Sequence, residues 1–145
     1  MAAMPSSPAP REPRGARAAI VAAGRRLGAR GLISAAEGNL SVRVDEGWLL
    51  VTPSGRRKDE LEPSDLLIVS AEPGADRGDA SSDIAIHRAV YAARPDVVAV
   101  VHAHLPAAMA LTLAGKIPDP SALPETALLL SSPASLWAAS PVLKW

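Results

Sequence analysis

The segment NLSVRVDEGWLLV, at residues 39–51, constrains the fold of this chain more than any other stretch. Its first half alternates Leu40, Val42 and Val44 with polar residues, which is the pattern of a strand with one buried face. Asp-Glu-Gly then forms a short turn signal, and the apolar run WLLV predicts a second strand. The segment therefore predicts a β-hairpin.

Helical and extended segments follow one another on both sides of this hairpin. Apolar residues at helical spacing, capping serines, prolines and glycines mark where each segment begins and ends. The predicted order is helix, strand, strand, strand, helix, strand, helix, over residues 14–31, 40–44, 48–51, 65–70, 81–94, 97–104 and 105–115.

This order predicts an α/β fold, and more narrowly a three-layer α/β/α sandwich with a mixed sheet. Residues 1–13 are rich in Pro, Ser and Ala and predict a disordered tail, so we expect the domain to occupy residues 14–145. The last segment, SSPASLWAASPVLKW, has no clear periodicity and supports no assignment.

Composition narrows the classes of function. Fifteen basic and fifteen acidic residues cancel, which argues against a nucleic-acid or membrane partner held by bulk charge. The chain has no cysteine, which excludes disulfides and thiolate metal sites and favours the cytoplasm. No run approaches the roughly 18 apolar residues of a membrane span. We therefore expect a soluble, cytoplasmic protein without a nucleic-acid or membrane partner.

Two of the three histidines stand one residue apart, at the end of the predicted strand VVAVVHAH. Because strand side chains alternate between faces, His102 and His104 point the same way and can aim two ring nitrogens at one ion. A frayed strand end whose histidines bond to water or backbone gives the same pattern. The third histidine, His87, lies four residues after Asp83 on the predicted helix, where it either orients that carboxylate or is solvated.

Five short motifs in a fixed order carry a resemblance to a known family. They are GNLS at 38–41, TPSG at 52–55, SSD at 81–83 with His87, ARPDVVAVVHAH at 93–104, and LP at the start of the last helix. Together they resemble the class II aldolase/adducin family, which includes the fuculose-phosphate and ribulose-phosphate aldolases and epimerases. The resemblance covers about residues 14–130.

The resemblance implies a zinc-dependent lyase that cleaves a phosphorylated ketose, or epimerises or dehydrates one, through a metal-stabilised enediolate. It implies that His102 and His104 are two of three histidine ligands of Zn²⁺, which acts as a Lewis acid. Asp83 takes the place of the family's catalytic acid/base. The sugar phosphate is expected in a cradle of hydroxyl, amide and backbone N–H groups at Asn39, Ser54, Gly55, Ser81 and Ser82. The resemblance also implies a homo-oligomer, a tetramer.

The sequence departs from the family pattern in two places. Asp83 stands where the family usually has Glu, so the base reaches less far by one methylene. The family's third histidine ligand falls beyond Trp145, and the pattern is lost after LPETALLL at 123–130, so we expect a chain that is incomplete on its carboxyl side. These departures leave an alternative open, namely a catalytically inactive fragment or an adducin-like interaction module.

Overall fold

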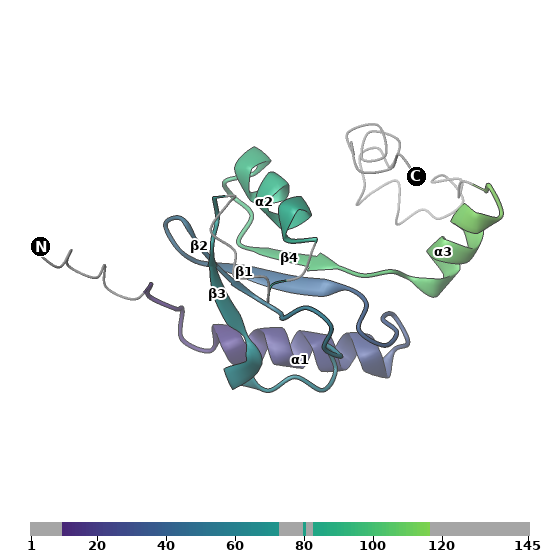
Figure 1. Cartoon of the computed structure of the whole chain (residues 1–145), viewed down its shortest axis with the longest axis horizontal. Helices are drawn as coiled ribbons and strands as arrows, with labels where there is room; N and C mark the ends of the chain where they lie inside the picture. The colour runs from purple at the N-terminus through teal and green to yellow at the C-terminus, as the bar shows by residue number, and fades with distance from the viewer. Residues whose placement is uncertain (1–9, 73–79, 81–82, 117–145) are drawn as a thin grey trace, which may run out of the picture. The chain divides into compact units, whose positions relative to one another are not determined.

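The computed structural model describes residues 10–72, 80 and 83–116, and its elements follow the predicted order (Figure 1). The chain divides into two units, residues 1–106 and 107–145, and the first contains the sheet with the two helices packed on it. The elements are α1 (Ala16–Ala29), β1 (Asn39–Asp45), β2 (Trp48–Val51), the 3₁₀ turn η1 (Pro63–Asp65), β3 (Leu67–Ser70), α2 (Ile84–Ala93), β4 (Ala99–His102) and α3 (Pro106–Leu113).

The four strands form one sheet in the order β3-β2-β1-β4. β1 and β2 form the predicted hairpin, whose turn includes Gly47 with a φ of 75°. The α/β class is confirmed, but the sequence predicts a mixed sheet and every strand pair in the described part of the chain is antiparallel. β1 is antiparallel to β2 because the hairpin reverses the chain between them. β1 is also antiparallel to β4, which the chain enters after α2. The remaining pair, β2 with β3, is antiparallel as well.

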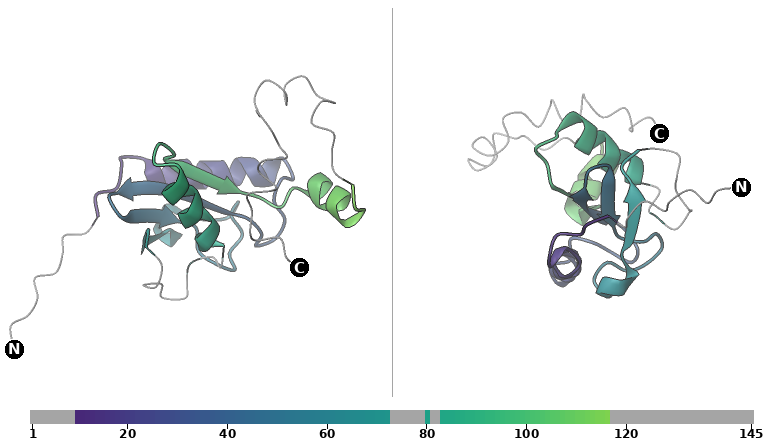
Figure 2. Two further views of the ribbon diagram at one scale, coloured as in Figure 1. Left: turned by 90° about the horizontal axis from the view of Figure 1, so that it is seen from above. Right: turned by 90° about the vertical axis from the view of Figure 1, so that its left-hand side faces the viewer.

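The sheet has two apolar faces, and α1 and α2 cover opposite ones (Figure 2). On one face, Ile20 of α1 belongs to the same buried cluster as Leu50 of β2. On the other face, Tyr91 of α2 shares a cluster with Leu49. Because neighbouring strand residues point to opposite sides, the adjacent leucines of β2, both fully buried, anchor one helix each.

The glycines predicted to stop the first and last helices do so. Gly31 has a φ of 63°, and its N–H donates to Gly28 O (2.9 Å) while the N–H of Leu32 donates to Leu27 O (3.0 Å). This pair of bonds is the Schellman motif, in which glycine adopts the left-handed conformation at low cost. Gly115 ends α3 with the same two bonds and a φ of 65°.

Two strands are shorter than the sequence predicts. β4 ends at His102, so His104 lies in the connection to α3 rather than on the strand. β3 begins at Leu67 because Asp65 belongs to η1, where its carboxylate accepts a hydrogen bond from the N–H of Glu62 (2.8 Å). At β3 a local turn takes the first residue of the predicted strand, whereas residues 103–105 after β4 form no regular structure.

Most of the predicted amino-terminal tail lies outside the described residues. In its described part, Glu12 forms an ion pair with Arg17 (2.7 Å), and the N–H of Arg11 donates to Asp45 (3.1 Å). The tail and the domain boundaries at 14–145 stay predictions. Within the described ranges, no helix combines the length and the apolar character needed to cross a membrane.

A buried lysine ties together the loop before β1 and the loop after β2. Lys58 is 2% exposed, and its Nζ donates to the carbonyl oxygens of Ala36 (2.7 Å) and Arg56 (2.6 Å). Burial lowers the pKa of Lys58, and the negative charge of Asp83 opposes that shift. Gly24 of α1 makes room for this lysine's backbone, since a Cβ at Gly24 would lie 2.1 Å from the Lys58 carbonyl oxygen.

Replacing Gly24 with alanine is expected to destabilise the fold, although alanine is the better helix former by about 1 kcal/mol. The new Cβ would overlap a backbone carbonyl, and overpacking of this kind costs roughly 1–3 kcal/mol. Urea unfolding followed by circular dichroism measures the change. The control is Ala22→Ser on the exposed side of α1, which is expected to stay within about 0.5 kcal/mol of the unmodified chain. A Gly24→Ala chain as stable as the original would contradict this packing.

Candidate metal centre and its buried support

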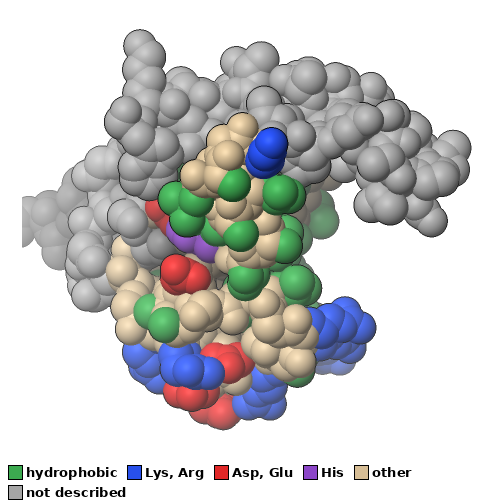
Figure 3. Space-filling model, turned by 90° about the vertical axis from the view of Figure 1, so that its right-hand side faces the viewer, with side chains coloured by type: hydrophobic (Ala, Val, Ile, Leu, Met, Phe, Trp, Pro, Cys, Tyr) green, Lys and Arg blue, Asp and Glu red, His purple; other side chains and the backbone are tan. Residues whose placement is uncertain are grey.

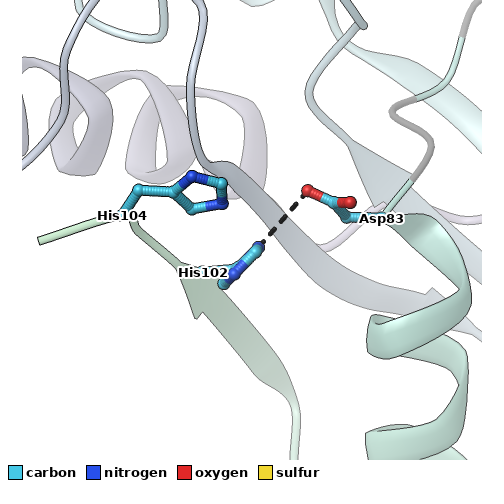
Figure 4. A group of neighbouring side chains, drawn as sticks. All are labelled: Asp83, His102 and His104. Carbon is cyan, nitrogen blue, oxygen red and sulfur yellow. Dashed lines mark ion pairs between the residues drawn. The ribbon is translucent and has the colours of Figure 1, made fainter. Parts of the chain in front are cut away.

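Asp83, His102 and His104 come together at one end of the sheet, with ligand atoms within 4.8 Å of one another (Figure 4). Asp83 occupies the N-cap position of α2, His102 ends β4, and His104 follows two residues later. His102 Nδ1 lies 3.5 Å from Asp83 Oδ2, and the centroids of the two histidine rings lie 4.9 Å apart. Two ring nitrogens and a carboxylate oxygen therefore converge on one point.

The surroundings of His102 Nδ1 indicate whether these three side chains could bind a metal ion. His102 Nδ1 is buried and has no hydrogen-bond partner within the described part of the chain. A buried polar atom without a partner costs about 1–3 kcal/mol. A divalent cation would use this lone pair as a ligand, and the imidazole nitrogens of His102 and His104 are donors that Zn²⁺ accepts. The residues present therefore fit a bound divalent ion.

The cluster is partly exposed. The side chains of His102 and Asp83 are 30% and 34% exposed. Figure 3 shows histidine and acidic side chains meeting on one surface of the molecule.

The register of β1 against β4 sets the position of His102. Asn39, the first residue of β1, pairs with His102 across the sheet. Gly38 precedes Asn39 with a φ of 72°, and a Cβ at Gly38 would lie 2.8 Å from the carbonyl oxygen of His102. Only glycine lets the two chains approach this closely with this backbone conformation.

A chain of hydrogen bonds connects Asp83 to the core between β1 and α2. Asn39 Nδ2 donates to Asp83 Oδ2 (2.8 Å), and His87 Nε2 lies 2.5 Å from Asn39 Oδ1. Ser41 Oγ lies 2.6 Å from His87 Nδ1 and 2.8 Å from Tyr91 Oη. The four residues behind Asp83 are at most 4% exposed. We call the hydrogen-bonded chain from Asp83 through these four residues the buried relay; its members are Asp83, Asn39, His87, Ser41 and Tyr91.

Burial lowers the pKa of His87 to about 4, with a smaller contribution from the charge of His102. The ring is therefore neutral near pH 7. The sequence leaves open whether His87 orients Asp83 directly or is solvated. The structure shows neither, because His87 is 1% exposed and Asn39 stands between the two side chains.

The predicted phosphate cradle is only partly described. Asn39 is buried beside Asp83, while Ser54 and Gly55 lie in the exposed turn after β2. Pro53 forms an isolated bridge with Ala80, which brings that turn next to the chain that leads into α2. The cradle stays a prediction, because two of its members lie outside the described residues, namely Ser81 and Ser82.

Sequence reasoning missed Ser41, Tyr91 and Lys58 as parts of this region. Two of them carry a signal that could have been found. Ser41 stands two residues after Asn39, so both share one face of β1. Tyr91 continues the four-residue spacing of Asp83 and His87, so these three share one side of α2.

Comparison with known proteins supports the same family. Residues 18–135 match the family described as Class II Aldolase and Adducin N-terminal domain. A methylthioribulose-1-phosphate dehydratase of Methylococcus capsulatus is 35% identical over 96 residues, which cover 66% of this chain and 47% of that protein. A 5-methylthioribulose-1-phosphate/5-deoxyribulose-1-phosphate aldolase of Rhodospirillum rubrum is 40% identical over 99 residues, which cover 67% of this chain and 44% of that protein.

A solved structure agrees in fold. The crystal structure of L-fuculose-1-phosphate aldolase from Thermus thermophilus has 44% sequence identity and a TM-score of 0.60, over 69% of this chain and 51% of that chain. This chain thus spans about half the length of the relatives that it matches. Since the family match extends over most of the sequence and the fold agrees, the chain belongs to the class II aldolase and adducin family.

Proposed function

We propose that this chain carries active-site residues of a metal-dependent lyase that cleaves, epimerises or dehydrates a phosphorylated ketose. One observation carries the proposal: His102 presents a buried ring nitrogen without a hydrogen-bond partner to Asp83 and His104. The names of similar proteins support the substrate class, since the dehydratase and the two aldolases described above are all named for ketose 1-phosphates.

We propose Zn²⁺ as the metal, with His102 and His104 as ligands. When bound, the ion would supply Lewis acidity that stabilises negative charge on a substrate oxygen. Asp83 would take a proton from the substrate and return it, as a general base and then a general acid. The side-chain N–H of Asn39 donates a hydrogen bond to Oδ2 of Asp83. This bond restricts the directions in which the second carboxylate oxygen, Oδ1, can point.

The phosphate group is proposed to bind at Asn39, Ser54, Gly55, Ser81 and Ser82. The charge on Lys58 supports this part of the proposal. Its ammonium group binds the carbonyl of Arg56, in the same loop as Ser54 and Gly55, and so places a buried positive charge within that loop.

Wider expectations belong to the same proposal. Helices on opposite faces of the sheet support a three-layer α/β/α sandwich in the complete domain. The lack of cysteine supports a cytoplasmic location. A homotetramer follows from the family resemblance alone. A second candidate function is a catalytically inactive fragment or an adducin-like interaction module. It is favoured by Asp83, which stands where the resemblance implies a Glu.

The purified chain is expected to bind Zn²⁺ with one ion per chain, and His102→Ala is expected to weaken binding more than about 10-fold because a ligand is lost. Isothermal titration calorimetry measures both quantities. Asp96→Asn is the matched control, because Asp96 forms an exposed ion pair with Arg94 instead of facing the cluster. Equal affinity of the His102→Ala and control chains would contradict the proposed ligand.

Asp83→Asn is expected to lower the rate of aldehyde release from a panel of ketose 1-phosphates by about 10²- to 10⁴-fold, because an amide cannot accept the proton. Zn²⁺ content, measured on the same samples, separates a lost base from a lost metal ion. A chain that binds Zn²⁺ but acts on no member of the panel favours the inactive alternative. Full activity of Asp83→Asn rules out the acid/base role.

A further inference from the structure

The proposed reaction uses Asp83 and Asn39 but leaves His87, Ser41 and Tyr91 without a role. We propose that His87 is a positioning residue for Asp83: its neutral ring fixes the side-chain amide of Asn39 with the NH₂ group toward the carboxylate. The inference rests on the proposed function only for the role of Asp83 itself.

The donor and acceptor of each hydrogen bond in the relay can be assigned in turn, starting from the Asp83 carboxylate. An ionised carboxylate only accepts, so Asn39 presents Nδ2 to Asp83 and turns Oδ1 toward His87. The proton of the ring must then be on Nε2. A neutral imidazole carries one proton, so its Nδ1 accepts, and the hydroxyl of Ser41 donates to it. Ser41 Oγ in turn accepts from the hydroxyl of Tyr91.

The geometry of a helix on a strand explains why a histidine fits at this place. Alternate residues of a strand lie about 6.6 Å apart, and residues four apart on a helix rise about 6 Å. The stripe of Asp83, His87 and Tyr91 on α2 therefore stays in step with Asn39 and Ser41 on β1. An imidazole has nitrogens on two sides of its ring, so one side chain can bond to both strand residues at once.

The relay holds Asn39 in one of its two amide orientations. Rotation of the amide by 180° would turn Oδ1 toward Asp83, where two acceptors would face each other. The N–H of His87 opposes that rotation by donating to Oδ1. Loss of this donor therefore weakens the hold on the Asp83 carboxylate, even though His87 does not contact Asp83.

Nuclear magnetic resonance of the full metal-free chain tests the ring directly. Long-range ¹H–¹⁵N spectra at pH 7 are expected to show His87 neutral with its proton on Nε2. Ser41→Ala removes the donor to Nδ1 and is expected to mix the two tautomers. Tyr91→Phe removes only the last hydroxyl and is the matched control, with the Nε2–H form retained. A charged ring, or a proton on Nδ1 in the unmodified chain, would overturn the inference.

Solvent exchange of the Asn39 side-chain NH₂ protons tests the effect on the carboxylate partner. His87→Leu is expected to raise their exchange rate at least 10-fold, and His87→Gln, whose amide can donate to Oδ1, is expected to restore much of the protection. Circular dichroism confirms that each variant is folded, and Ser41→Ala replaces His87→Leu if the latter does not fold. Unchanged protection in a folded His87→Leu chain refutes the positioning role. Neither measurement needs metal or substrate, so either result stands apart from the success or failure of the lyase proposal.

Discussion

The antiparallel pairing of β1 with β4 is the constraint on which the candidate site depends. It sets Asn39 opposite His102, and the bare backbone of Gly38 allows the two chains to meet there. α2 packs on the same face of the sheet and brings Asp83 to the same corner. A slip of one residue in this pairing would turn His102 to the other face, because strand side chains alternate. The position of the candidate metal site is therefore a property of the sheet register.

The contact between α2 and β1 is polar, whereas the apolar clusters on the two faces of the sheet are largely aliphatic. Buried polar groups are tolerated where each finds a partner, and they then favour one arrangement over its neighbours. The chain has a single tyrosine, and it lies here, with its hydroxyl at the end of the relay and its ring 4.7 Å beneath the guanidinium of Arg43. Apolar packing holds α2 against the sheet. The hydrogen bonds of His87 to Asn39 and Ser41 fix the position of α2 along β1.

Local signals in the sequence were enough to predict the order of the elements, the hairpin and the helix ends at Gly31 and Gly115, because those features depend on neighbouring residues. The convergence of His102, His104 and Asp83 was also within reach, since family motifs indicated it. The antiparallel course of β4 and the place of Asn39 between Asp83 and His87 were not, because both depend on how distant segments pack. Lys58 stands among polar residues in the sequence, and only the tertiary structure shows it buried.

The burial of Lys58 also makes its amine a reporter of motion. Reagents that acylate amines need access to Nζ, and this nitrogen is held by two carbonyls inside the protein, whereas Lys116 is open to solvent. Acylation of Lys58 must wait until the loops before β1 and after β2 separate. The ratio of the two labelling rates thus records how often those loops open, without any substrate.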